Sequence, residues 1–463
     1  MIKCNIIFFS IVGQYNIIIK IVCVVSTQLE YHRVSEIKKD EFLGKDIKIR
    51  GWVYRIRKQK DKAFIIIRDD RGGIIQCVLP SASVPDLTIE SSLEIQGILF
   101  KDDRAKEGGY EIRGNDVKIH SIADNDFPIG EYQSTELLLD YRHLTLRTRK
   151  MIAVAKLRAT ILEKVRNWFN ENGWMEVNVP TLVKSAVEGG STLFPVKYFK
   201  DDAFLSQSAQ LYLEALIFSL GPVWTIGPSF RAEKSRTLRH LAEYLHLEAE
   251  APWISLNDLF SIQEKLLINL VGHVIDDRKE ELEYLKRDIH SLTQIKEPFD
   301  KLSYNQAIEI LSSLDIQVQE EEGSRKIKWG DDLNIDSEKA LTKDRTNPVF
   351  VYGYPLEVKP FYVKEDPKTP GIALTTDLLL PNGFGEVSSG GMREDNITLL
   401  KSRIEGEGLK MNSYSWYTDL RKYGSVPHGG FGIGIERLVR WITNLEDIKE
   451  CVLFPRTMAR LDP

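Results

Sequence analysis

The stretch SFRAEKSRTLRHLAEYLHLEAE, Ser229–Glu250, carries the strongest structural signal in the chain. Its two ends read as strands, and its middle is rich in Arg and Lys, a composition that suits a loop around a polyphosphate. Side chains alternate along a strand, so one face of the second end collects four residues: Tyr244, His246, Glu248 and Glu250. The pattern predicts a hairpin with a ligand-facing side, although alternation alone also fits a solvated sheet edge.

Two later stretches add candidate site residues. In GGFGIGIERLVRWI, Gly429–Ile442, glycines allow close backbone approach to a ligand, and Glu436-Arg437 opens a helix. The stretch lacks the lysine of a P-loop and is weak evidence alone. In TTDLLLPNGFGEVSSGGMRED, Asp377 and Glu386 are hard carboxylate ligands that suit Mg²⁺ bridging phosphates. Two surface acids in a hairpin would look the same.

The regions around these stretches indicate an α/β domain from Arg142 onward. Residues 156–171 have an apolar stripe of helical period, and Asn172-Gly173 ends that helix before a strand that stops at Pro180. We expect an amphipathic helix over 256–290 and a charged, loop-rich insertion up to residue 345. After Pro348 the chain becomes β-rich and Gly-rich.

The preceding part predicts a separate small domain. Between about Val34 and Ile122, five short strands alternate with turns, which suggests an OB-fold barrel. In the first strand Ile47, Ile49 and Val53 occupy the buried side. A linker follows over 125–141. Residues 1–30 form an apolar extension that polar residues interrupt, so a membrane-spanning helix is not supported.

Composition limits the function classes. The chain has 463 residues, 43% hydrophobic and 28% charged, with a net charge of -5, so nucleic-acid affinity would need a local basic surface. The segment Lys45–Lys62 is such a surface. The four cysteines are isolated, which argues against a zinc ribbon, a CxxC centre and a disulfide framework, and favours a reducing, cytoplasmic location.

Three parts of the chain resemble the three motifs of class II aminoacyl-tRNA synthetases: the first is the helix and strand that end at Pro180, the second is FRAE to LEAE within Ser229–Glu250, and the third is GGFGIGIERL. With a barrel ahead of them, their order and spacing resemble the aspartate/asparagine/lysine subgroup. The resemblance implies an α+β architecture: an N-terminal OB-fold β-barrel (31–124) that binds the anticodon, then a catalytic domain (142–463) whose mostly antiparallel sheet is flanked by helices, with an insertion at about 256–345. It also implies a homodimer, ATP as substrate and Mg²⁺ as cofactor.

Family roles transfer to matching positions. Arg231 resembles the arginine on the ATP α-phosphate, Glu233 a contact near adenine, and Tyr244 the aromatic that stacks on adenine. Arg437 resembles the arginine on the other face of adenine and the γ-phosphate. Asp377 and Glu386 match the metal-binding acids, although Asp377 matches less well because nine residues separate the pair. Catalysis by Arg231 and Arg437 is then positioning and charge neutralisation, without a protein nucleophile.

The amino-acid substrate is inferred from QSAQLYLE, residues 207–214. Relatives that activate aspartate carry a pattern resembling QSPQLxK, whose lysine pairs with the substrate carboxylate, and Leu213 stands at that place here. Glu248 can accept from an amide NH₂ and Arg393 can donate to its oxygen. Glu188, together with Ser208 and Gln210, is predicted to hold the α-ammonium group of the substrate, although any of the three could instead be a loop cap or a structural hydrogen-bonding residue.

The chain therefore resembles the asparaginyl-tRNA synthetases of archaeal or eukaryote-like type. The implied reaction is ATP-dependent ligation of L-asparagine to tRNA(Asn) through an asparaginyl-adenylate, releasing AMP and pyrophosphate. Phe64 and Gln76 match positions that contact the central anticodon uridine, though Phe64 could equally be core. Rival hypotheses are a non-discriminating aspartyl-tRNA synthetase, a tRNA-independent asparagine synthetase, and a non-catalytic RNA-binding paralogue.

Overall fold

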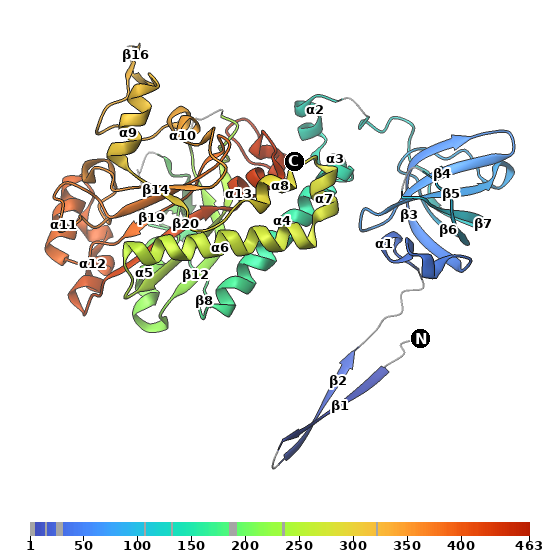
Figure 1. The fold of residues 1–463 in the computed structure, drawn as a ribbon, viewed down its shortest axis with the longest axis horizontal. Helices are drawn as coiled ribbons and strands as arrows, with labels where there is room; N and C mark the ends of the chain where they lie inside the picture. The colour runs from blue at the N-terminus through green and yellow to red at the C-terminus, as the bar shows by residue number, and fades with distance from the viewer. Residues whose placement is uncertain are drawn as a thin grey trace. The chain divides into compact units, whose positions relative to one another are not determined.

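The computed structural model describes residues 31–463 except 106–107, 131–132, 185–191, 234–236 and 321–322, together with two earlier strands. The chain divides into two compact units, Met1–Tyr141 and Arg142–Pro463 (Figure 1). None of the helices in the described part of the chain is long and apolar enough to cross a membrane.

The first unit contains a closed five-stranded barrel. An antiparallel hairpin of β1 (Asn5–Gly13) and β2 (Asn16–Val24) and a one-turn helix, α1 (Val34–Ile37), come before it. The barrel strands are β3 (Asp46–Lys58), β4 (Lys62–Arg68), β5 (Ile74–Pro80), β6 (Ser92–Lys101) and β7 (Tyr110–Ser121). They close in the order β3-β4-β5-β7-β6, with β5 and β7 parallel, which confirms the predicted OB-fold.

Alternation along the strands separates the inside of the barrel from its outer surface. Ile47, Ile49 and Val53 are fully buried inside, as predicted. Opposite Phe64 of β4 lies Val78 of β5, and the next outward-facing position of β5 is Gln76, so Phe64 and Gln76 are diagonal neighbours on the outer surface. After the barrel, the predicted linker contains a short helix, α2 (Thr135–Asp140), whose N-terminus is capped by Ser134.

The second unit is built on an eight-stranded sheet in the order β14-β17-β18-β19-β20-β13-β12-β8. Its strands are β8 (Met175–Glu176), β12 (Val223–Phe230), β13 (Glu243–Pro252), β14 (Asp300–Ser303), β17 (Val349–Tyr352), β18 (Thr375–Leu380), β19 (Gly385–Met392) and β20 (His428–Gly434). Only the end pairs β14–β17 and β12–β8 are parallel, which confirms the mostly antiparallel sheet.

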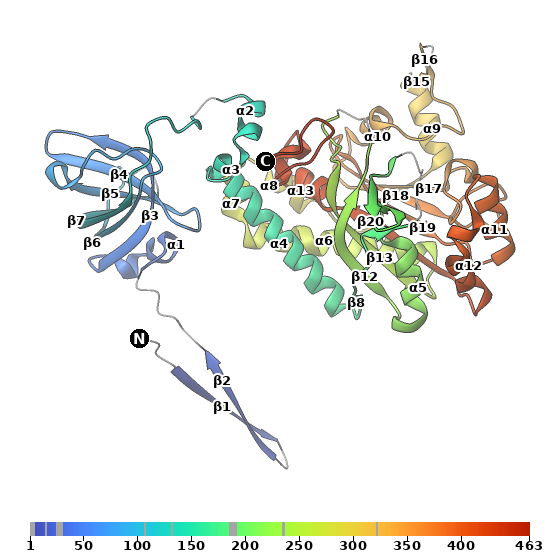
Figure 2. The ribbon, with the colours of Figure 1, turned by 180° about the vertical axis from the view of Figure 1, so that it is seen from behind.

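Helices surround this sheet (Figures 1 and 2). They are α3 (Arg142–Thr145), α4 (Arg149–Glu171), α5 (Gln210–Leu220), α6 (Leu256–Asp277), α7 (Lys279–Tyr284), α8 (Ile289–Thr293), α9 (Tyr304–Ser313), α10 (Ile335–Thr342), α11 (Ile397–Gly406), α12 (Ser415–Lys422) and α13 (Ile435–Thr443). Smaller sheets are formed by β9 (Leu182–Val183), β10 (Pro195–Tyr198) and β11 (Asp201–Leu205), and by β15 (Gln317–Glu320) and β16 (Gly323–Lys326).

The main core lies between the sheet and the helices α4, α6 and α13. The predicted stripe of α4, including Leu157, Ile161 and Val165, is buried in the same core cluster as Leu247 and Ala249 of β13. Since strand neighbours point to opposite faces, the four polar residues of β13 are directed away from this core. The packing of the apolar face thus determines which face of β13 is available to a ligand.

The structure differs from the sequence-based expectations in three places. Residues 256–290 form three helices rather than one, because Arg278 and Lys286 leave helical geometry, the latter with φ of 57°. The strand predicted to stop at Pro180 covers only β8. Within the predicted insertion at 256–345, α6 belongs to the main core and β14 is a strand of the central sheet.

Candidate active site

A cavity of about 410 Å³ lies against the polar face of β13 and collects residues from β18, β19, β20 and the start of α13. Among the residues that line it are eleven of the predicted site residues: Ser208, Gln210, Leu213, Arg231, Glu233, Tyr244, Glu248, Asp377, Glu386, Arg393 and Arg437. Glu188 lies outside the described residues. These residues come from segments far apart in sequence, so their convergence makes this cavity the candidate active site.

Cations gather around a carboxylate in one part of the cavity. Arg437, in the first turn of α13, donates from Nη1 to Oε1 of Glu386 at 3.0 Å. Burial alone would raise the pKa of Glu386, but Arg437 and Arg239, with more distant cations, hold it below its ordinary value. Arg231 Nη1 lies 3.6 Å from Glu233 Oε1, and its guanidinium carbon is 6.0 Å from the ring centroid of Tyr244.

Asp377 and Glu386 lie on the neighbouring strands β18 and β19. Asp377 pairs with Ser389, and Leu379, two residues further along β18, pairs with Glu386 on β19. A bulge lies between these two pairs, so Asp377 and Glu386 are near one another on adjacent strands but not directly opposite. Asp377 accepts from Ser389 Oγ at 2.6 Å and lies 3.4 Å from Lys359 Nζ. Carboxylate oxygens on neighbouring strands are the hard ligands that a divalent cation prefers, and such a cation would add charge neutralisation for phosphate oxygens.

Several charged residues of the cavity were not predicted from the sequence. Arg239 Nη2 donates to Glu338 Oε2 at 2.7 Å, and that same oxygen accepts the backbone N–H of Glu386 at 2.8 Å. Arg239 is in the basic loop of Ser229–Glu250 and could have been proposed from that position. Glu338 and Lys359 gave no local signal, because their contacts are made with distant strands. The charged segment before residue 345 thus contributes to the cavity wall through Glu338.

The carboxylate of Glu248, on β13, lies against the N-terminus of α5. It accepts from the hydroxyl of Ser208 and from the backbone N–H of Ala209, at 2.9 and 3.0 Å for the two oxygens. His246 Nδ1 lies 3.4 Å from it. Burial would raise the pKa of Glu248, but His246, Ser208 and Ala209 lower it below its ordinary value, so it is an anion at neutral pH.

Leu213 has two kinds of neighbour. It is 1% exposed and packs with Ala209, Ile217 and Val223, and it also lines the cavity. A lysine at this position would therefore place an ammonium group at the cavity wall. In the same helix Gln210 Nε2 donates to Oε1 of Glu214 at 3.0 Å.

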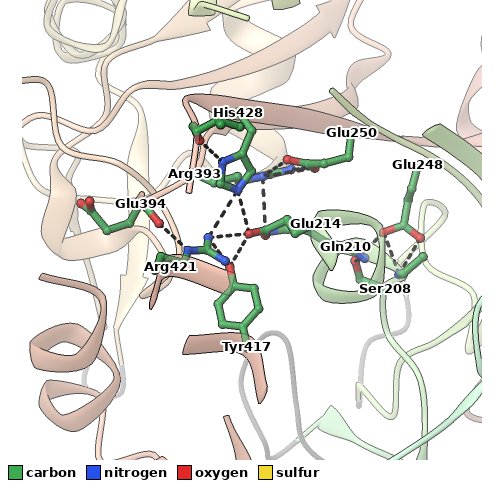
Figure 3. Close-up of polar contacts among 12 residues, drawn as sticks. Ser208, Gln210, Glu214, Glu248, Glu250, Arg393, Glu394, Tyr417, Arg421 and His428 are labelled. Carbon is green, nitrogen blue, oxygen red and sulfur yellow. Dashed lines mark hydrogen bonds and ion pairs between the residues drawn. The ribbon is translucent and has the colours of Figure 1, made fainter. Parts of the chain in front are cut away.

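Arg393 and Glu250 form a buried bidentate pair (Figure 3). Nε and Nη2 of Arg393 donate to the two oxygens of Glu250 at 3.0 and 2.9 Å. Glycines make room for this face of β13: a Cβ on Gly430 would lie 2.0 Å from Glu250 Oε2, and one on Gly432 would lie 2.3 Å from His246 Nε2. The glycines that we expected to face a ligand thus admit protein side chains at these two positions.

In the barrel unit, Phe64 and Gln76 both have charged neighbours. The guanidinium carbon of Arg57 lies 5.0 Å from the ring centroid of Phe64, and Gln76 Nε2 donates to Glu111 Oε2 at 3.2 Å. Both side chains are half-buried rather than core. This outer face combines an aromatic ring, an amide and several cations, which are the groups that single-stranded nucleic acid requires.

Comparison with known proteins finds a matching family model for each of the two units. Residues 134–458 match the model of class II tRNA synthetases (D, K and N), and residues 47–119 match that of an OB-fold nucleic acid binding domain. The asparagine–tRNA ligase of Pyrococcus furiosus is 48% identical over 93% of this chain and 98% of its own length. That of Thermoplasma acidophilum is 43% identical over 93% and 99%.

Solved structures give the same result. The asparaginyl-tRNA synthetase from Pyrococcus horikoshii complexed with asparaginyl-adenylate superposes with a TM-score of 0.88 at 45% identity, covering 94% of this chain and all of that one. The Entamoeba histolytica asparaginyl-tRNA synthetase in complex with asparaginyl-adenylate gives 0.85 at 33% identity, covering 95% and 100%. This chain belongs to the asparaginyl-tRNA synthetase family, within the class II (D, K and N) enzymes.

Proposed function

We propose that this asparagine–tRNA ligase carries out both of its reaction steps at the cavity on β13. The carboxylate of L-asparagine attacks the α-phosphorus of ATP, pyrophosphate leaves, and the adenylate then transfers its acyl group to the terminal ribose of tRNA(Asn), releasing AMP. The convergence of Arg231, Arg437 and Glu386 with an amide-compatible pocket around Leu213 is the observation that supports this assignment.

The nucleotide is held by charge and stacking. Arg231 contacts the α-phosphate and later the adenylate, Tyr244 stacks on adenine with Glu233 near it, and Arg437 covers the other side of adenine and the γ-phosphate. Asp377 and Glu386 are the residues that would hold Mg²⁺. Because Arg437 already pairs with Glu386 at 3.0 Å, these two side chains can redistribute their contacts when the triphosphate binds.

The amino acid is selected by hydrogen bonding rather than by a lysine that neutralises a carboxylate. Glu248 accepts a hydrogen bond from the amide NH₂ and repels a carboxylate, and Arg393 donates to the amide oxygen. Leu213 stands where aspartate-activating relatives have a lysine. Ser208 and Gln210, with Glu188, hold the amino acid backbone. A buried carboxylate without a partner would cost on the order of 2–5 kcal/mol, whereas an amide needs no neutralisation.

Pyrophosphate exchange with asparagine, aspartate and lysine tests this function. Exchange that depends on asparagine and is much slower with the other two amino acids is the expected result. Comparable exchange with aspartate would indicate a non-discriminating aspartyl-tRNA synthetase. Conversion of aspartate and ammonia to free asparagine without tRNA would indicate an asparagine synthetase.

The barrel face with Phe64 and Gln76 binds the anticodon in this proposal. Replacing Phe64 by Ala should raise the KM for tRNA by roughly fivefold to a hundredfold, because stacking on one base is worth about 1–3 kcal/mol. Asparagine-dependent pyrophosphate exchange should not change, since that reaction needs no tRNA. An unchanged KM for tRNA would remove Phe64 from the anticodon surface. A transcript with an altered central anticodon base is the matched control.

We further propose a cytoplasmic homodimer. The free cysteines Cys77 and Cys451 are buried, consistent with a reducing compartment. Exposed apolar side chains near the end of the first motif, Met175 at 48% and Leu182 at 43% exposure, are suitable for a subunit interface. Sedimentation of the purified protein, in which a monomer would contradict the proposal, measures this.

A further inference from the structure

Glu214, on α5 beside Leu213, is the centre of a buried polar cluster (Figure 3). It has no exposed surface. Its Oε2 accepts from Tyr417 Oη at 2.7 Å and from Arg421 Nη2 at 2.5 Å, and lies 3.1 Å from His428 Nε2. Its other oxygen accepts from Gln210 Nε2. Residues from α5, α12 and β20 thus converge on a single carboxylate.

The cluster joins two residues that are proposed to touch the amino acid. Gln210 is held directly by Glu214, and Nε of Arg393 lies 3.9 Å from Glu214 Oε1. Arg393 is paired at the same time with Glu250, whose two oxygens occupy its Nε and Nη2. Within the described residues, its Nη1 donates no hydrogen bond.

The cluster is better explained by ion pairing than by a metal ion. Ligand atoms of Glu214, Glu250 and His428 lie within 4.8 Å of one another, a spacing that could hold a cation. Two guanidinium groups, of Arg393 and Arg421, already contact the two carboxylates. A further divalent cation would face like charges on two sides, so the carboxylates neutralise arginines instead.

We propose that Glu214 is a specificity-determining positioning residue, which together with Glu250 neutralises Arg393 and so makes it a hydrogen-bond donor for an amide rather than a counter-ion for a carboxylate. This rests on the proposed asparagine-activating function. Leu213 and Glu214 then act together. Leu213 places an apolar side chain where aspartate-activating relatives have a lysine, and Glu214 neutralises the charge of Arg393.

Arg393 lies at a buried position, where its side chain is only 5% exposed. An unpaired guanidinium at Arg393 would attract the side-chain carboxylate of aspartate strongly, because charges interact more strongly away from water. A guanidinium already paired with two carboxylates attracts the aspartate carboxylate much less. It still keeps an N–H that can donate a hydrogen bond to the neutral amide oxygen of asparagine. The compensating carboxylates must be ionised. Arg421 and His428 hold the pKa of Glu214 below its ordinary value despite its burial. Burial raises the pKa of Glu250, and the two hydrogen bonds from Arg393 oppose that rise and favour the ionised carboxylate.

Glu214→Gln tests the proposal because it removes the charge and keeps the shape. In pyrophosphate exchange, the ratio of kcat/KM for asparagine to that for aspartate should fall on the order of tenfold, while the KM for ATP stays within about twofold. Both amino acids are measured on one preparation, so a reduced folded fraction cancels from the ratio. Glu250→Gln, expected to lower the ratio similarly, is the second variant if Glu214→Gln does not fold.

Two further variants separate charge from packing. Glu214→Asp keeps the charge but is one methylene shorter, so it should weaken both amino acids alike and leave the ratio near that of the unmodified protein. Glu264→Gln removes another buried carboxylate, whose Oε1 accepts the Phe299 N–H at 2.9 Å outside the cavity, and should leave the ratio unchanged.

An unchanged ratio in the Gln variants, or an equal fall in Glu264→Gln, would overturn the proposal. Failure of the unmodified protein to exchange with asparagine would instead refute the proposed function, so the two failures are distinguishable. Equal losses for asparagine and aspartate in Glu214→Gln would show that the cluster supports packing alone.

Discussion

The two halves of the cavity are built differently. In the nucleotide half, Arg231 and Glu233 are 3.6 Å apart and about one third exposed. In the amino-acid half, Arg393 and Glu250 are 2.9 Å apart, and their side chains are at most 5% exposed. A partly exposed ion pair can exchange partners when a triphosphate binds and pyrophosphate leaves, whereas a buried bidentate pair keeps its geometry. The difference indicates that Arg231 and Glu233 of the proposed nucleotide site can rearrange, whereas the Arg393–Glu250 pair of the proposed amino-acid site is preformed.

The largest effect is expected from the nucleotide half. Arg437→Ala removes a proposed phosphate contact and leaves Glu386 without its nearest cation at 3.0 Å. Loss of one such preorganised donor typically lowers the rate about 10²–10³-fold, so kcat for pyrophosphate exchange should fall by this amount. Arg440→Ala is the matched control, because this arginine is on the next turn of α13, is not among the residues lining the cavity, and donates from Nε to the Glu446 carbonyl at 2.9 Å. Near-normal exchange in Arg437→Ala would contradict the proposed role.

A smaller but selective effect is expected in the amino-acid half. Leu213→Lys buries an ammonium group among Ala209, Ile217 and Val223 and adds a second cation beside the already paired Arg393. We expect kcat/KM for asparagine to fall on the order of tenfold or more, because an uncompensated buried charge is strongly unfavourable. Leu213→Met keeps the site apolar and should have little effect. Unchanged asparagine kinetics in the lysine variant would remove Leu213 from the specificity argument.

The preformed half was only partly predictable from the sequence. Strand alternation correctly placed Tyr244, His246, Glu248 and Glu250 on the cavity face, because the side-chain period of a strand is fixed by backbone geometry. It could not identify Arg393 as the partner of Glu250, since that contact joins residues 143 positions apart. Local pattern therefore predicts which face a residue occupies, and tertiary packing decides what it meets there.

The same limit applies to the charged segment before residue 345 and to the glycines of β20. Glu338 reaches the cavity only because α10 lies near β18 and β19, and no spacing in the sequence encodes that approach. Gly430 was expected to give a ligand access, but what it admits is the carboxylate of Glu250. A glycine-rich strand shows that something approaches closely, without showing whether it is a ligand or a side chain.

The smallest effect is expected from the exposed ion pair of the nucleotide half, and it sharpens the contrast with Glu214. Glu233→Gln removes the charge partner of Arg231 at a partly exposed site, where such a pair is worth about 0–1 kcal/mol. The melting temperature should therefore stay close to that of the unmodified protein, and the KM for ATP should rise by roughly a few-fold, since one proposed contact near adenine is weakened. Glu214→Gln should show the opposite pattern, with altered amino-acid selectivity and unchanged ATP affinity. Thermal unfolding and ATP titrations of pyrophosphate exchange on both variants measure the difference. If Glu233→Gln lowers the melting temperature as much as Glu214→Gln does, the proposed contrast between the two halves is wrong. A partly exposed charge would then contribute as much to the stability of the fold as a buried one.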